Sequence, residues 1–202
     1  MSTRHVVLAL LDIQPMTGYD IRAHFPVSLG SLWSASYGQI YPTLHKLHED
    51  GLVTRTDKQS GQRKRFEYAI TEAGKAELLS WLHEPVEYPP ARDPFLFWAS
   101  NMNVLPHDVV RAGITRHIEL HADRKQFLDD IIASILDGTH PLIESRAATL
   151  TPAELQRLQR TRAFVFEELA QRAQEEIDRA NRLRVYYETS LAESEASEKS
   201  LQ

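Results

Sequence analysis

The sequence predicts a mainly α-helical protein of two domains, and three observations lead to this expectation. The first 84 residues follow the order helix, helix, helix, β-hairpin, helix. The segment Pro85–Pro94 contains four prolines, which is typical of a domain boundary. Beyond it, apolar residues recur every three or four positions, which indicates an all-helical second domain. We therefore predict domains at residues 1–84 and 85–192 and a disordered polar tail at 193–202.

Composition excludes several classes of protein. The chain has 202 residues and no cysteine, so we expect neither disulfide bonds nor cysteine–metal sites. It has no run of about 18 apolar residues, so we expect no membrane contact. The apolar run Val6–Ile13 lacks a small-residue cleavage site, so we expect a cytoplasmic protein without a signal peptide. No nucleophile motif, glycine-rich phosphate loop or pair of carboxylates in an apolar setting is present, so we expect neither an enzyme nor a cofactor.

Caps and helix breakers define the first two helices. Thr3 can cap a helix that runs to about Asp12, which is apolar all round and should be buried. Pro15 stops this helix. Thr17 then caps a short second helix at residues 18–25.

The third helix has a signal at each end. Ser36 and Gln39 have the spacing of a capping box, which predicts its start. Gly51 suits the position just after its end. In the Schellman cap that this glycine favours, Leu52 contacts Leu47.

Pro42 lies inside this predicted helix, where a proline normally breaks hydrogen bonding. At about 100° per residue, Ile40, Leu44 and Leu47 share the core face. Pro42 and Gly38 point the opposite way, where a slight bend is tolerated. We interpret them as a flat strip that allows the helix start to approach a ligand closely.

Two predicted strands follow, at residues 52–56 and 65–70. The polar link 57–64 predicts a hairpin with a long tip, and Thr71 caps a fourth helix that ends before Pro85. Three helices, a β-hairpin wing and a fourth helix are the elements of a winged helix-turn-helix, whose third helix enters the DNA major groove.

Three segments of this domain resemble the PadR family of bacterial transcriptional regulators: TGYDI at 17–21, GQIYPTLHKLHEDGLV at 38–53 and YAITEAGKAEL at 68–78. The segment RDPFLFW at 92–98 resembles the start of the helical dimerisation domain that often follows. The resemblance implies a homodimeric repressor whose C-terminal helices hold the dimer and help to sense a ligand. The wing departs from the family, because SGQRKR stands where members often have a glycine–arginine–proline turn.

Residue chemistry supports DNA binding by the third helix and the wing. The net charge is −5, yet Arg55–Arg65 contains five basic residues and one acidic residue. Such a wing suits phosphate or minor-groove contacts, and polar side chains on the helix suit base edges. The expected DNA-binding residues are Ser36, Tyr37, Gln39, Tyr41, Thr43, His45, Lys46, Arg63, Lys64 and Arg65.

A charged hairpin tip is usually only a solvated surface, and winged folds also bind proteins. The joint position of the polar residues on one face of the third helix favours DNA. The alternative is a helical dimer whose winged module docks a protein partner.

The second domain has clear helix boundaries. Asp93 caps a short aromatic helix, and Pro106 opens a long helix that Gly138 closes. Thr151 and Glu154 predict the start of a last helix with an apolar stripe of about nine turns. We expect this stripe to need a second subunit. The expected dimerisation residues are Leu155, Leu158, Val165, Leu169, Ile177 and Leu183.

Aromatic residues near the domain junction suggest a pocket for a small aromatic effector, formed by Trp33, Phe95 and Trp98. The alternative is that they pack the junction as core. His117 and His121 have a spacing that can hold a metal, but no third ligand is apparent. Since chance produces such pairs among nine histidines, we expect no metal site.

Overall fold

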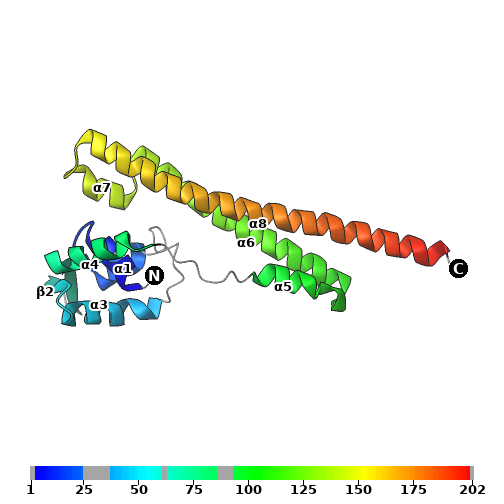
Figure 1. Cartoon of the computed structure of the whole chain (residues 1–202), viewed down its shortest axis with the longest axis horizontal. Coiled ribbons are helices and arrows are strands. Elements are labelled where there is room, and N and C mark those ends of the chain that lie inside the picture. Colours follow the sequence, from blue (N-terminus) through cyan, green and yellow to red (C-terminus); the bar gives the residue numbers. More distant parts are fainter. Residues whose placement is uncertain (1–2, 25–36, 61–62, 86–92, 201–202) are drawn as a thin grey trace. The chain divides into compact units, whose positions relative to one another are not determined.

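The computed structural model describes residues 3–24, 37–60, 63–85 and 93–200. The chain divides into two compact units, Met1–Tyr88 and Pro89–Gln202, each of which is described by itself (Figure 1). The division lies close to the boundary that we predicted at residues 84/85.

The first unit has the predicted winged helix-turn-helix order. Its elements are α1 (Thr3–Leu11), β1 (Met16–Thr17), α2 (Gly18–His24), the 3-10 turn η2 (Tyr37–Gln39), α3 (Ile40–Glu49), β2 (Val53–Ser60), β3 (Arg63–Ile70) and α4 (Glu72–His83). Helix α1 packs against both α3 and α4, and Leu8 of α1 and Leu44 of α3 are fully buried. Burial of such a side chain contributes about 1.5–3 kcal/mol, so these apolar contacts hold the recognition-type helix on the core.

The sheet differs from the sequence prediction in two respects. Strand β1 was not predicted, and it pairs antiparallel with β3, in the order β1-β3-β2. The predicted long hairpin tip was wrong, because β2 and β3 continue pairing as far as Ser60 and Arg63. The outer part of the hairpin carries polar residues and has no alternating apolar pattern. Pairing between the backbones of β2 and β3 extends the strands there, and such pairing leaves no signal in the sequence.

The second unit is all helical, as predicted. Its elements are α5 (Pro94–Ser100), the 3-10 turn η3 (Met102–Val104), α6 (His107–Asp137), α7 (Pro141–Ala147) and α8 (Pro152–Ser200). Helices α6 and α8 lie side by side (Figure 1) and run antiparallel, since Arg111 pairs with Glu188 at 2.7 Å while Gln159 donates to the Ile135 carbonyl at 3.0 Å. Within the described part of the chain, no helix has the length and apolar character needed to cross a membrane.

The predicted caps of this unit are present. The Asp93 carboxylate accepts a hydrogen bond from the Leu96 N–H at 2.9 Å. Gly138 ends α6 with a φ of 84°, a conformation that favours glycine. The Thr151 N–H donates to the Glu154 carboxylate at 2.9 Å, which completes the capping box of α8.

Two expectations for α8 need correction. Its apolar stripe is partly covered within the same chain, because packing against α6 leaves Leu169, Ala173 and Ala180 buried. The predicted tail at 193–202 is wrong for most of its length, since α8 continues to Ser200. The tail contains alanine, glutamate and lysine, which are good helix formers even where no apolar face is available for packing.

Candidate nucleic-acid interface and aromatic pocket

Helix α3 has one buried face and one exposed polar face. Ile40, Leu44 and Leu47 are at most 1% exposed and anchor the helix to the core. His45 and Lys46 project from the exposed face. Because the apolar anchor fixes the rotation of the helix about its axis, these two polar side chains are held toward solvent.

Two other predicted residues of α3 already have neighbours in the unit. The Gln39 amide oxygen accepts a hydrogen bond from the Thr3 hydroxyl at 3.2 Å. Thr43 is half-buried and lines a groove between α3 and the start of α1, which also includes Lys46. Gln39, His45 and Lys46 are exposed, so they are better presented for base contacts than the half-buried Thr43.

Pro42 does not interrupt a helix, which corrects the sequence interpretation. The predicted helical start near Ser36 is instead the 3-10 turn η2, and α3 begins at Ile40. Pro42 is then in the first turn, with Gln39 as the N-cap residue, where a backbone N–H has no partner within the helix. Gly38 and Pro42 are both exposed, as the helix geometry predicts.

The end of α3 fixes where the wing begins. Gly51 has a φ of 71°, and the Leu52 N–H donates to the Leu47 carbonyl at 2.9 Å, which confirms the predicted Schellman cap. The Thr71 hydroxyl donates to the Gly51 carbonyl at 2.9 Å. The chain on both sides of the wing is therefore tied to the C-terminus of α3.

Tyr41 packs on α2. A Cβ atom on Gly18 would lie 2.6 Å from Cε1 of Tyr41, so any other residue there would require the Tyr41 ring to shift. Tyr41 is nevertheless 48% exposed and remains able to donate its hydroxyl to a phosphate.

Sequence reasoning missed Tyr19 of α2, which lies at the same surface. Its ring is 63% exposed and lines a hollow of about 280 Å³ together with Tyr41, His45 and Arg65. The Arg65 guanidinium lies 5.8 Å from the centre of the Tyr19 ring, a cation–π contact. The only available signal was the position of this aromatic residue within TGYDI. The hollow therefore joins residues of α2, α3 and β3 into one surface that is largely aromatic and carries the polar groups of His45 and Arg65.

The described part of the wing carries the basic residues Arg55 of β2 and Arg65 of β3. Arg55 lies 4.3 Å from the ring centre of Phe66, which holds the guanidinium against the sheet.

Ser36 and Trp33 lie outside the described residues. Tyr37 is in η2, and Arg63 and Lys64 are in β3 beside Arg65.

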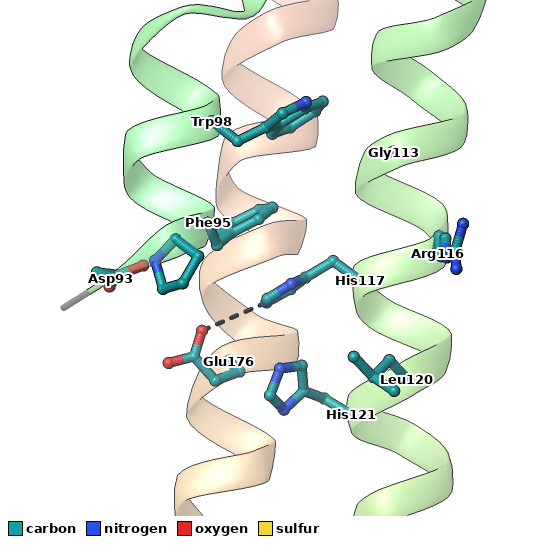
Figure 2. A pocket seen from close by; sticks show the side chains of 10 residues that line it. Asp93, Phe95, Trp98, Gly113, Arg116, His117, Leu120, His121 and Glu176 are labelled. Atoms are coloured by element: carbon teal, nitrogen blue, oxygen red, sulfur yellow. Dashed lines mark hydrogen bonds and ion pairs between the residues drawn. The ribbon is translucent and has the colours of Figure 1, made fainter.

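Phe95 and Trp98 line a pocket that lies wholly within the second unit (Figure 2). The pocket measures about 560 Å³ between α5, α6 and α8. Phe95 is 8% exposed, and its ring stacks on His117 at 3.8 Å between ring centres. A Cβ atom on Gly113 would lie 2.6 Å from Cζ2 of Trp98, so this glycine makes room for the indole. Phe95 and Trp98 thus pack against the core of the second unit and also line its pocket, whereas both sequence interpretations placed them at the junction of the domains.

Polar groups lie at one end of this pocket. His117 Nε2 is 3.3 Å from a carboxylate oxygen of Glu176, on α8. Arg179 pairs with Glu176 at 3.3 Å and with Asp93 at 2.5 Å. Burial, reinforced by the neighbouring His117, lowers the pKa of His121, so the neutral imidazole is favoured there. An aromatic wall with a few convergent polar groups is typical of a small-molecule site.

The first unit presents an exposed polar helix beside a two-stranded basic wing. This arrangement is typical of winged-helix DNA-binding regulators. The sequence pattern described as the transcriptional regulator PadR-like family matches residues 7–80. The chain is also 31% identical over 137 residues to the probable transcriptional regulator Rv1176c of Mycobacterium tuberculosis, covering 64% of this chain and 72% of that protein. The chain belongs to the PadR-like family of transcriptional regulators, which confirms that it is not an enzyme.

A second curated relative matches over a shorter stretch of the chain. The negative transcriptional regulator PadR of Bacillus subtilis is 41% identical over 86 residues. This alignment covers 41% of the present chain and 47% of the Bacillus protein, so the chain matches about half of that relative.

Solved structures resemble the chain over most of its length. Smu.1604c of Streptococcus mutans has a TM-score of 0.63 at 27% identity, covering 88% of this chain and 99% of that one. Bacillus subtilis PadR in complex with operator DNA gives 0.58 at 23% identity, covering 84% and 98%. The same protein in complex with p-coumaric acid gives 0.61 at 24%, covering 89% and 92%. The Vibrio cholerae virulence activator AphA gives 0.57 at 29%, covering 90% and 99%.

Proposed function

We propose that this chain binds operator DNA as a homodimer, represses transcription and responds to a small aromatic ligand. The observation that carries the proposal is the exposed polar face of α3, which its buried apolar residues hold toward solvent. In this proposal His45 and Lys46 contact base edges in the major groove, and Arg63, Lys64 and Arg65 contact phosphates or the minor groove. Action on chromosomal DNA places the protein in the cytoplasm.

The surface of the second unit supports the homodimer. Phe97 is 75% exposed, and Val104 of η3 is 85% exposed. Large exposed apolar side chains are typical of interaction sites. Among the predicted dimerisation residues, Leu155, Leu158, Val165, Ile177 and Leu183 remain half-buried and can contribute, whereas Leu169 is buried within the chain.

A two-fold dimer implies a two-fold operator. Identical α3 helices would read an inverted repeat whose half-sites lie about 10 base pairs apart, or a multiple of this spacing. Bacillus subtilis PadR, to which the chain is similar, has been solved in complex with operator DNA.

Repression is supported by the name of the Bacillus subtilis relative, a negative regulator that is 41% identical in the matched region. The resemblance to the activator AphA favours the opposite sign, at a lower identity of 29%. A reporter gene under the control of the operator distinguishes repression from activation. Removal of the regulator raises expression for a repressor and lowers it for an activator.

The aromatic pocket supports a small aromatic effector. Its volume of about 560 Å³ lies in the usual range of ligand pockets, and Phe95 and Trp98 offer faces for ring stacking. Bacillus subtilis PadR has been solved with p-coumaric acid, an aromatic acid. We therefore expect such an acid to weaken operator binding by the present chain, with quenching of tryptophan fluorescence as a direct measure of its binding.

Selection from random-sequence DNA with the purified full chain tests the proposal. An enriched inverted repeat is the expected result and establishes both DNA recognition and two-fold symmetry. Micromolar binding without sequence preference would instead support the alternative, in which the winged module docks a protein partner.

A further inference from the structure

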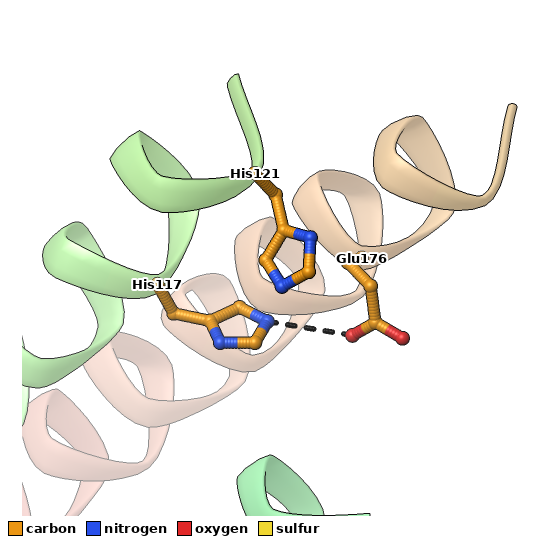
Figure 3. A group of neighbouring side chains, drawn as sticks. All are labelled: His117, His121 and Glu176. Carbon is orange, nitrogen blue, oxygen red and sulfur yellow. Dashed lines mark hydrogen bonds and ion pairs between the residues drawn. The ribbon is translucent and has the colours of Figure 1, made fainter. Parts of the chain in front are cut away.

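Three metal-ligating side chains converge at the polar end of the aromatic pocket. His117 and His121 lie one turn apart on α6, and Glu176 reaches them from α8 (Figure 3). One ligand atom from each of the three lies within 4.8 Å of the others. We propose that His117, His121 and Glu176 bind a divalent transition-metal ion of the zinc type.

The ligand chemistry fits this class of ion. Imidazole nitrogens with one carboxylate oxygen form a three-ligand set for Zn²⁺, which leaves a fourth tetrahedral position for water or a bound ligand. Ligand atoms about 2.1 Å from such an ion lie roughly 3.4 Å from one another. The present separation of 3.3 Å between His117 Nε2 and the Glu176 oxygen already matches this geometry.

Neighbouring groups hold two of the ligands in place. The Phe95 ring stacks on His117 and restricts the orientation of its imidazole. Arg179 contacts Glu176 Oε1, while Oε2 faces His117 and is the oxygen placed for the ion. Outer contacts of this kind orient ligands in metal sites.

His121 contributes the third ligand through one of its two ring nitrogens. Its Nδ1 atom is buried and has no hydrogen-bond partner among the residues that the structure describes. Buried polar atoms in folded proteins nearly always have a partner. Figure 3 shows that the other ring nitrogen of His121, Nε2, is the one directed toward His117 and Glu176. Nε2 is therefore the nitrogen placed for the ion, and binding through it leaves the imidazole proton on Nδ1.

The structure adds a third ligand to the histidine pair that the sequence contains. Two histidines one turn apart arise by chance in a histidine-containing helix, and the sequence offered no third ligand. The antiparallel packing of α6 and α8 supplies Glu176, so three protein ligands from two helices meet in one place. The open coordination position would face a pocket lined by Phe95 and Trp98.

The test measures metal binding by the full chain without a histidine tag. Zinc chloride is titrated calorimetrically, and cobalt chloride is titrated with visible absorption as a probe of tetrahedral coordination. We expect one ion per chain and the cobalt bands of a tetrahedral site. Loss of a ligand should weaken binding at least as much as the roughly 10–100-fold loss typical of outer-shell changes. His121→Asn and Glu176→Gln test this expectation.

His83→Asn is the matched control, because His83 is an exposed histidine on α4, in the other unit. It should bind zinc like the unaltered chain. Circular dichroism confirms that each variant is folded, and Glu176→Gln, which preserves side-chain size, decides the matter if His121→Asn does not fold. Absence of tetrahedral cobalt bands, or zinc affinity unchanged in Glu176→Gln, would overturn the proposal. Because no DNA is present, the result is independent of operator binding.

Discussion

The two units of the chain present different exposed surfaces. On the outer face of α3, the exposed side chains include His45, Lys46 and Glu49, which are polar or charged. In the second unit, Phe97 and Val104 are large, apolar and mostly exposed. The contrast concerns these two surfaces and not the whole units, because the first unit also exposes Leu79 and Leu82. The outer face of α3 offers polar contacts, whereas Phe97 and Val104 offer the apolar contacts that are typical of an interaction site.

Phe97→Glu should have the largest effect, because it places a charge on the exposed apolar surface of the second unit. A two-fold interface contains the residue twice, so loss of two buried phenylalanine side chains should weaken the dimer by about 3–6 kcal/mol. Light scattering during size-exclusion chromatography over a concentration series measures the effect. Leu82→Glu is the control, because Leu82 is 62% exposed in the first unit. Equal dimer stability in both variants would exclude Phe97 from the interface.

Leu44→Ala should damage the first unit and spare the second. Removal of this fully buried side chain should lower the free energy of unfolding by about 2–5 kcal/mol, because it leaves a cavity beneath α3. Denaturant unfolding measures the loss. The chain should remain dimeric while its operator affinity falls, and dissociation into monomers would show that the two units are not independent.

Lys46→Ala should affect DNA binding without affecting the fold. A lost base contact should weaken operator binding by about 1–3 kcal/mol in each half-site and leave binding to random DNA largely unchanged. Fluorescence anisotropy with both DNAs measures the difference. Arg65→Ala is the comparison, because loss of one phosphate contact in each half-site should weaken both complexes and reduce the salt slope of the dimer by about 1.8. A parallel loss on both DNAs for Lys46→Ala would assign it to a phosphate instead.

Pro42→Ala should have the smallest effect on stability. Since Pro42 lies in the first turn of α3, its replacement should change the free energy of unfolding by less than about 1 kcal/mol. A larger change in thermal unfolding would contradict this position. Altered operator affinity at unchanged stability would support the interpretation that Gly38 and Pro42 form the surface of closest approach to DNA.

Local sequence was enough to predict much of the first unit. Caps and breakers depend on neighbouring residues, so the Schellman cap at Gly51 and the order of helices and hairpin were predicted correctly. Strand β1 could not be predicted, because Met16 and Thr17 are extended only through pairing with Tyr68 and Glu67. The polar outer hairpin was missed for the same reason, since its stability depends on backbone pairing.

For this protein, the sequence by itself determined the fold class, the family and the polar character of α3, because each depends on residue type and spacing along one element. The tertiary structure decided which part of the α8 stripe α6 covers and which residues surround the aromatic pocket. It also brought Glu176 to His117 and His121. These features depend on the register of two antiparallel helices, and contacts between residues so far apart in the chain leave no local pattern in the sequence.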